Sequence, residues 1–184
     1  MSEPGPSDEV LMQSVGRGDL HAFDQIVLRH QSGAWSVAYR FLGDSDEAED
    51  MVQKAFLRIL DAADRYKPTA TFRTYLYRVL TRLCIDHARK KRPIPTGELP
   101  EMPAPGPTQA QRIERIETES AIRKALDALP PKYRMVIVLR YFEGLSGAEI
   151  AEAMKTSPKG GERLLERARQ SLEPLLRPFR EENR

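Results

Sequence analysis

The sequence predicts an all-α protein built from two small helical domains that are joined by a proline-rich linker. Apolar residues recur at three- and four-residue spacing along most of the 184 residues, which is the period of one face of an α-helix. No segment alternates at period two for long enough to indicate a sheet. Prolines clustered between Pro93 and Pro107 divide the helical pattern, so we expect domains at residues 1–92 and 113–184 and a linker at 93–112.

The first domain is expected to be a bundle of about four helices. Gly43 stands where a helix C-cap is typical. Asp44, followed three residues later by Glu47, resembles the N-cap of the next helix, and Pro68 breaks the pattern after it. The apolar stripes place the helices near residues 10–15, 20–41, 44–63 and 72–87.

The second domain begins with a stripe that Pro130 and Pro131 interrupt, and Pro131 can open the next helix at its first position. Ser146 and Glu149 have the spacing of a capping box. Ser157 as N-cap and Pro158 then begin a long basic helix. A short capped helix, a tight turn and a basic helix together match a helix-turn-helix.

Composition excludes several classes of protein. Cys84 is the only cysteine, so no internal disulfide can form, and the first residues lack a signal peptide's basic start and apolar stretch. No apolar run approaches the roughly 20 residues that a membrane-spanning helix needs. We therefore expect a cytoplasmic protein with no membrane insertion and no cofactor. An enzyme is the least favoured reading, because His21, His30 and His87 lack metal-ligand spacing and no phosphate-binding loop or nucleophile elbow occurs.

The net charge is only +2, yet the charges are unevenly distributed. On the predicted helix that ends at Arg92, four arginines fall within about 80° of one another, away from the apolar face. Such a row suits a phosphate backbone, although a solvated helix face has the same pattern. Nearby tyrosines could stack on unpaired bases or simply pack. The residues are Arg78, Arg82, Arg89 and Arg92, with Tyr66, Tyr75 and Tyr77 beside them.

The third predicted helix carries a mixed surface that suits a protein partner better than DNA. Acidic residues from Asp44 to Asp50 complement the helix dipole, which explains most of them without a partner. The remaining candidates share a polar face beside the expected exposed edge of Phe56 and Leu57. They are Asp50, Gln53, Lys54, Phe56 and Leu57.

If the helix-turn-helix is real, the early turns of the last helix enter the major groove. The base-edge candidates are Lys159, Glu162, Arg163 and Glu166. Arg163 is best able to bridge a guanine, whereas Arg167 and Arg169 suit phosphates.

Four segments carry a family resemblance: FLGDSDEAEDMVQKAFLRIL, TFRTYLYRVLTRLCIDHARKKR, LDALPPKYRMVIVLRYFEGLSGAEIAEAM and ERARQSL. In this order and spacing they resemble a bacterial sigma factor of the extracytoplasmic-function group, group 4 of the sigma-70 family. The resemblance implies two domains, called region 2 and region 4, that direct core RNA polymerase to promoters and help to open the −10 element. A stand-alone helix-turn-helix regulator and a helical adaptor remain as alternatives.

The resemblance also implies roles for the candidate residues. The mixed surface would dock on the polymerase clamp coiled coil, and region 4 would contact the flap as well as the −35 element through Lys159 to Arg169. The loop from Tyr66 to Thr71 and the following helix would hold the melted −10 element. An anti-sigma factor is the expected regulator. The −10 candidates are Tyr66, Lys67, Thr69, Thr71, Tyr75, Arg78, Arg82, Arg89 and Arg92.

Departures from the family pattern lead to two further expectations. The family commonly has tryptophan and asparagine where this chain has Tyr75 and Arg82, and threonine, valine and lysine where it has Gly160, Gly161 and Glu162. Each glycine should cost about 1 kcal/mol relative to alanine and remove a DNA contact, which predicts a weak or unusual −35 preference. We also expect the tethered domains to pack together in the free protein.

Overall fold

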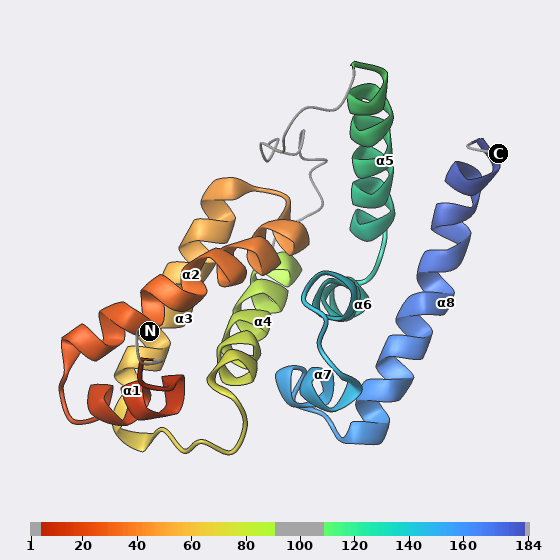
Figure 1. Cartoon of the computed structure of the whole chain (residues 1–184). Coiled ribbons are helices and arrows are strands. Elements are labelled where there is room, and N and C mark those ends of the chain that lie inside the picture. Colours follow the sequence, from red (N-terminus) through yellow and green to blue (C-terminus); the bar gives the residue numbers. More distant parts are fainter. Residues whose placement is uncertain (1–4, 91–108, 183–184) are drawn as a thin grey trace.

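The computed structural model describes the backbone of residues 5–90 and 109–182 and the side chains of 5–90 and 118–178. Every regular element in these described ranges is helical, as the sequence predicts. Figure 1 shows two groups of helices lying side by side, the first running from α1 to α4 and the second from α5 to α8. No helix in the described ranges is long and apolar enough to cross a membrane.

The first group is a four-helix bundle, which confirms the prediction. A short 3₁₀ turn at Ala63–Arg65 follows the third helix, and an irregular segment then leads to the fourth. The helices are α1 (Asp8–Val15), α2 (Leu20–Leu42), α3 (Ser45–Asp61) and α4 (Phe72–Lys90).

Local capping residues set the helix ends in this bundle. The Asp19 carboxylate accepts a hydrogen bond from the Ala22 amide and caps α2. Gly43 ends α2 in the left-handed conformation (φ 79°), which favours glycine. One residue later Asp44 accepts from the Glu47 amide at 2.9 Å and starts α3. The predicted boundary between these two helices is therefore confirmed.

The second group contains the predicted helix-turn-helix. α6 opens with Pro131 at its first position and continues without a break into a π-helical turn at Val138–Phe142. α5 begins at Gln109, so it starts four residues inside the predicted linker; the last residues of that segment hold no proline and can be helical. The helices are α5 (Gln109–Asp127), α6 (Pro131–Ile137), α7 (Gly147–Ala153) and α8 (Pro158–Glu182).

The two groups share one hydrophobic core. α4 packs against both α6 and α7, and α2 contacts the π-helical turn. Buried side chains such as Phe41 and Phe72 in the first group and Leu139 and Ile150 in the second belong to the same cluster. The prediction that the tethered domains pack together is therefore confirmed in this structure, and Figure 1 shows α6 and α7 next to α4.

Candidate nucleic-acid and polymerase interfaces

The mixed surface on α3 is smaller than predicted. Gln53 is exposed, Leu57 is 52% exposed, and Asp50 pairs with Lys54 one turn later at 2.5 Å. Phe56, which we expected to offer an exposed edge, is only 6% exposed. Its ring packs edge-on against Phe23 of α2, with the centroids 6.4 Å apart, so this part of the prediction is wrong.

The segment between α3 and α4 combines exposed polar side chains with a buried aromatic base. Lys67, Thr69 and Thr71 are exposed. Tyr66 is half-buried: its ring lies 5.3 Å from that of Tyr75 and its hydroxyl is buried without a hydrogen-bond partner. Burial is the main cause that raises the pKa of Tyr66. Lys67 and Thr69 are thus open to a ligand, whereas the Thr71 hydroxyl already bonds to Thr74 and Tyr66 mainly packs.

The N-terminal half of α4 faces the second group of helices. The Arg78 guanidinium lies 5.1 Å from the centre of the Tyr75 ring and forms a 2.5 Å ion pair with Glu152 of α7. Tyr77 is buried, and its hydroxyl donates to the Glu143 carboxylate at 2.6 Å. Burial, followed by this hydrogen bond, raises the pKa of Tyr77 to about 12. Tyr77 is therefore a packing residue, and Arg78 already has an anionic partner.

The later arginines of α4 are open to solvent. Arg82 is exposed and lies 3.9 Å from Asp86 on the same helix, a distance at which the pairing is weak. Arg89 is also exposed, and Arg92 lies outside the described residues. Arg78, Arg82 and Arg89 give α4 one basic edge that can follow a phosphate backbone.

The helix-turn-helix has the predicted caps. Ser146 and Glu149 form the complete capping box at the start of α7. Lys155 makes the turn with a φ of 54°, and the Ser157 hydroxyl accepts from the Gly160 amide to cap α8. All six predicted −35 residues are exposed along α8, although Arg169 also donates to the Tyr141 hydroxyl at 2.9 Å. They are Lys159, Glu162, Arg163, Glu166, Arg167 and Arg169.

The two glycines of α8 face protein rather than solvent. A Cβ at Gly161 would lie 2.9 Å from the Ala151 Cβ of α7, so the missing side chain allows close helix packing. A Cβ at Gly160 would meet the side chains of Thr156 and Ser157. The lost DNA contact that we gave as one reason for a weak −35 preference therefore fails at Gly161, where a side chain would point into α7 instead of into a groove. The helix-propensity reason and the preference itself stay predictions.

Sequence reasoning missed the residues that join the two groups. Arg73 donates from Nη2 to the carbonyl oxygen of Glu143 at 2.6 Å and forms an ion pair with its carboxylate. Arg123 and Arg134 donate to main-chain carbonyls at the end of α2, a position that favours cations. Arg123 lies against Gly43, where a Cβ would overlap it. The sequence shows these only as charged residues on amphipathic helices.

The arrangement defines a class of protein: a helical bundle with one basic helix edge, joined to a helix-turn-helix. Family models match both parts, "Sigma-70 region 2" over residues 26–94 and "Sigma-70, region 4" over residues 119–172.

Relatives match nearly the whole chain. The ECF RNA polymerase sigma factor SigW of Bacillus subtilis is 33% identical, with 90% of this chain and 95% of that protein covered. The RNA polymerase sigma-H factor of Pseudomonas aeruginosa is 32% identical over 94% of this chain and 95% of that protein. The chain therefore belongs to the ECF sigma factors, a family of RNA polymerase sigma factors.

Solved structures agree with this fold. CnrH in complex with the cytosolic domain of CnrY is 28% identical, with a TM-score of 0.71 over 94% of this chain and 99% of that one. The sigma factor RpoE of Bartonella quintana, solved with the anti-sigma factor NepR, has a TM-score of 0.63 at 21% identity over 84% and 96% of the two chains, and shows the fold alone.

Proposed function

We propose that this sigma factor divides promoter recognition between the two faces described above. As a sigma factor it directs core RNA polymerase to specific promoters and helps to open the −10 element. In our assignment, residues 1–92 bind the clamp and the −10 element, 93–112 link the domains, and 113–184 bind the −35 element and the flap. The observation that supports this assignment is the order of both sigma regions along one chain, each bearing an exposed basic helix.

For the clamp we propose the exposed part of the α3 surface, namely Gln53, Leu57 and the Asp50–Lys54 pair. An exposed leucine ringed by polar groups is suited to a protein interface. Phe56 supports this surface from beneath through its packing on Phe23. A Phe56→Ala variant would therefore test folding rather than binding, because emptying a buried aromatic site costs about 3–5 kcal/mol.

For the −10 element we propose that Lys67, Thr69 and Thr71 of the α3–α4 segment contact the melted DNA. The arginines that would follow its phosphate backbone are Arg78, Arg82, Arg89 and Arg92. Tyr66 and Tyr75 would form the aromatic floor. For the −35 element we propose Lys159, Glu162, Arg163 and Glu166 at base edges, and Arg167 and Arg169 at phosphates, because these side chains are exposed on the helix that follows the turn.

Further parts of the proposal follow from the family. We assign the protein to group 4 of the sigma-70 family and place it in the cytoplasm, where core polymerase works. We further propose that it has no catalytic activity of its own and that the polymerase catalyses RNA synthesis. We also propose an anti-sigma factor as its regulator. The 28% identical CnrH was solved with the cytosolic domain of a second protein, which supports a partner that holds a sigma factor of this fold.

Run-off transcription tests the assignment. Purified bacterial core polymerase is combined with the full chain on fragmented genomic DNA, and a Gln53→Ala/Leu57→Ala variant is compared with Leu28→Ala, which removes a leucine that is 70% exposed on α2. We expect discrete transcripts that the α3 variant abolishes and Leu28→Ala leaves intact. Salt-sensitive duplex binding without any transcript would instead favour the stand-alone regulator.

A further inference from the structure

Helix α1 contacts both ends of the segment that joins α3 to α4. At one end, α1 stops at Gly16, where a Cβ would lie only 2.6 Å from the Ala63 carbonyl oxygen. At the other end, the Phe72 amide donates to the Glu9 carboxylate at 3.3 Å. Residues 67–71, all exposed except the half-buried Ala70, therefore lie between two fixed points. Both points are supplied by α1, which precedes the residues matched by the region 2 family model.

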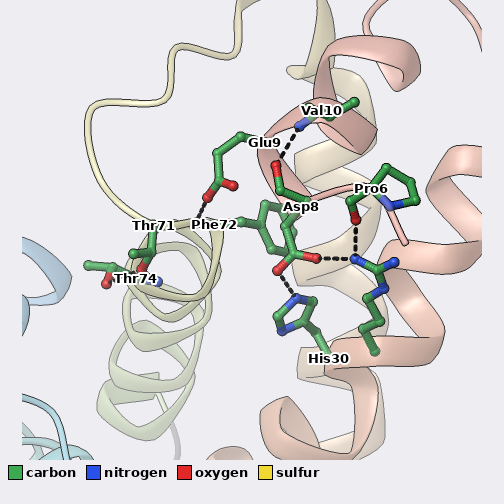
Figure 2. Close-up of polar contacts among 10 residues, drawn as sticks. Pro6, Asp8, Glu9, Val10, His30, Thr71, Phe72 and Thr74 are labelled. Carbon is green, nitrogen blue, oxygen red and sulfur yellow. Dashed lines mark hydrogen bonds and ion pairs between the residues drawn. The ribbon is translucent and has the colours of Figure 1, made fainter. Parts of the chain in front are cut away.

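The position of Glu9 is fixed by its neighbour in the chain. The Asp8 carboxylate accepts from the Arg29 guanidinium at 3.0 Å and lies 2.7 Å from Nε2 of His30, both on α2. Arg29 also donates to the Pro6 carbonyl at 2.8 Å. These contacts hold the first turn of α1 on α2, and Figure 2 shows Glu9 reaching away from them towards the start of α4.

At the start of α4 the Glu9 carboxylate accepts a hydrogen bond from the Phe72 amide, which has no acceptor within its own helix. The first amides of a helix lack intrahelical acceptors and attract negative charge. The Thr71 hydroxyl accepts from the Thr74 amide at 3.3 Å, and Glu9 accepts from that of Phe72. After burial, the charge of Glu9 is the largest cause that raises the pKa of Tyr66. The two acceptors together fix where the segment ends and α4 begins.

We infer that Glu9 is a positioning residue for reading of the −10 element: it holds the Phe72 amide and thereby orients the exposed side chains of Lys67, Thr69 and Thr71. This inference rests on the proposed role of that segment. Glu9 itself does not contact DNA in our proposal. Its loss should therefore reduce discrimination between −10 sequences while leaving polymerase binding unchanged.

The test uses holoenzyme reconstituted with the full chain. Transcription is measured from a promoter mapped by run-off and from the same promoter with its −10 bases substituted, and the ratio gives the −10 discrimination. Glu9→Ala removes the acceptor, whereas Glu9→Gln retains an amide oxygen that can accept from Phe72. Asp24→Ala, which removes an exposed carboxylate on α2, is the matched control. Core affinity is measured by fluorescence titration for each variant.

We expect Glu9→Ala to reduce the −10 ratio about fivefold, the effect of losing one hydrogen bond of ordinary strength, because the contact is long and Glu9 is only half-buried. Core affinity should be unchanged, and Glu9→Gln and Asp24→Ala should stay within about twofold of the original protein. Gly16→Ala, which forces the other end of the segment to move, should also lower the ratio. An undiminished ratio in Glu9→Ala would overturn the inference, as would an equal loss at both promoters or a Gln variant as defective as Ala.

The proposed function fails in a different way. If holoenzyme with the original protein transcribes the mapped promoter and its −10-substituted form equally, residues 67–71 do not read the −10 element. The inference about Glu9 then fails together with the proposed role of these residues. If the original protein discriminates and Lys67→Ala or Thr69→Ala reduces the ratio, the role stands and the Glu9 variants decide the inference alone.

Discussion

The two helices proposed to meet promoter DNA differ in what surrounds their arginines. On α4, Arg73 and Arg78 are held by Glu143 and Glu152 of the second group of helices. On α8, Arg163 and Arg167 are exposed. The −10 face is therefore partly covered by the protein's own acidic residues, while the −35 face is open. If these helices bind DNA as proposed, we expect DNA to reach α8 directly in the packed arrangement but to displace carboxylates to reach the start of α4.

The largest expected effect comes from removing the carboxylates that hold α4. Glu143→Ala/Glu152→Ala removes the carboxylates that pair with Arg73 and Arg78 and leaves the buried Tyr77 hydroxyl without an acceptor, although Arg73 keeps its bond to the main-chain carbonyl of residue 143. We expect the packed arrangement to weaken by about 2–3 kcal/mol, or roughly 50-fold. Energy transfer between dyes attached at Gln13 and Glu173, both exposed, should report a longer distance.

A second double variant provides the control for this experiment. Asp46→Ala/Glu49→Ala removes two exposed carboxylates from α3 and so changes the net charge equally. It should leave the dye distance unchanged. If both double variants gave the original distance, the acidic contacts would not hold the two groups together, and the shared hydrophobic core alone would be responsible.

Arginine substitutions on the two helices should differ in kind. Arg163→Ala should cost about 1–3 kcal/mol at a matched −35 element and relax its sequence preference, and Arg167→Ala should weaken all sequences and lower the salt slope by about one. Arg78→Ala should cost less, because it removes a DNA contact and also frees α4 from Glu152. DNA-binding isotherms at several salt concentrations would separate the three variants. Equal losses of binding free energy for Arg78→Ala and Arg163→Ala would contradict the difference that we propose between α4 and α8.

The difference between the two helices also marks what the sequence could predict. Helix ends follow from adjacent residues, so the caps at Gly43, Asp44 and Ser146 were predictable from local spacing. Whether a residue at the edge of an apolar helix face is buried depends on the neighbouring helix. The sequence therefore could not show that Phe56 packs against Phe23 of α2, and Phe56 was predicted to be partly exposed.

Contacts between the groups depend on how two tethered domains dock. The Glu143 carboxylate accepts hydrogen bonds from Arg73 and Tyr77, which lie about 70 positions earlier in the chain. Arg123 donates to main-chain carbonyls more than 80 positions away. Neither has a sequence signature beyond charge. The same holds for Gly161, whose role depends on the closeness of Ala151. Local chemistry therefore predicted the helices and candidate surfaces, whereas docking decided which candidates are covered.

The two glycines of α8 should respond to alanine with opposite signs. At Gly161 the new methyl group meets the Cβ and backbone of Ala151, so α7 must move away, and we expect a loss of about 1–2 kcal/mol. At Gly160 it meets the Thr156 hydroxyl, which can rotate away, and lies 3.1 Å from the Ser157 hydroxyl that caps α8, which has to shift only slightly. The gain in helix propensity should therefore stabilise the protein by about 0.5–1 kcal/mol. Urea unfolding of the pair measures both, and a stabilised Gly161→Ala would contradict the close packing.

The smallest expected effect is the pH dependence of the α7 cap. Hydrogen bonds from the Ser146 amide and hydroxyl lower the pKa of Glu149 below its ordinary 4.5. A lowered folded pKa means that the charged form stabilises the fold above about pH 4.5, and that this contribution is lost as the pH falls through the folded value. Compared with Glu149→Gln, the original protein should be more stable by a few tenths of a kcal/mol at neutral pH, because the site is partly exposed to solvent. The difference should disappear once the pH has fallen through the folded pKa of Glu149. Urea unfolding of both proteins from neutral to acid pH isolates Glu149, since they share every other carboxyl group. A difference in stability that persisted in acid would show that the side-chain amide of the Glu149→Gln variant fails as a cap for reasons other than its lack of charge.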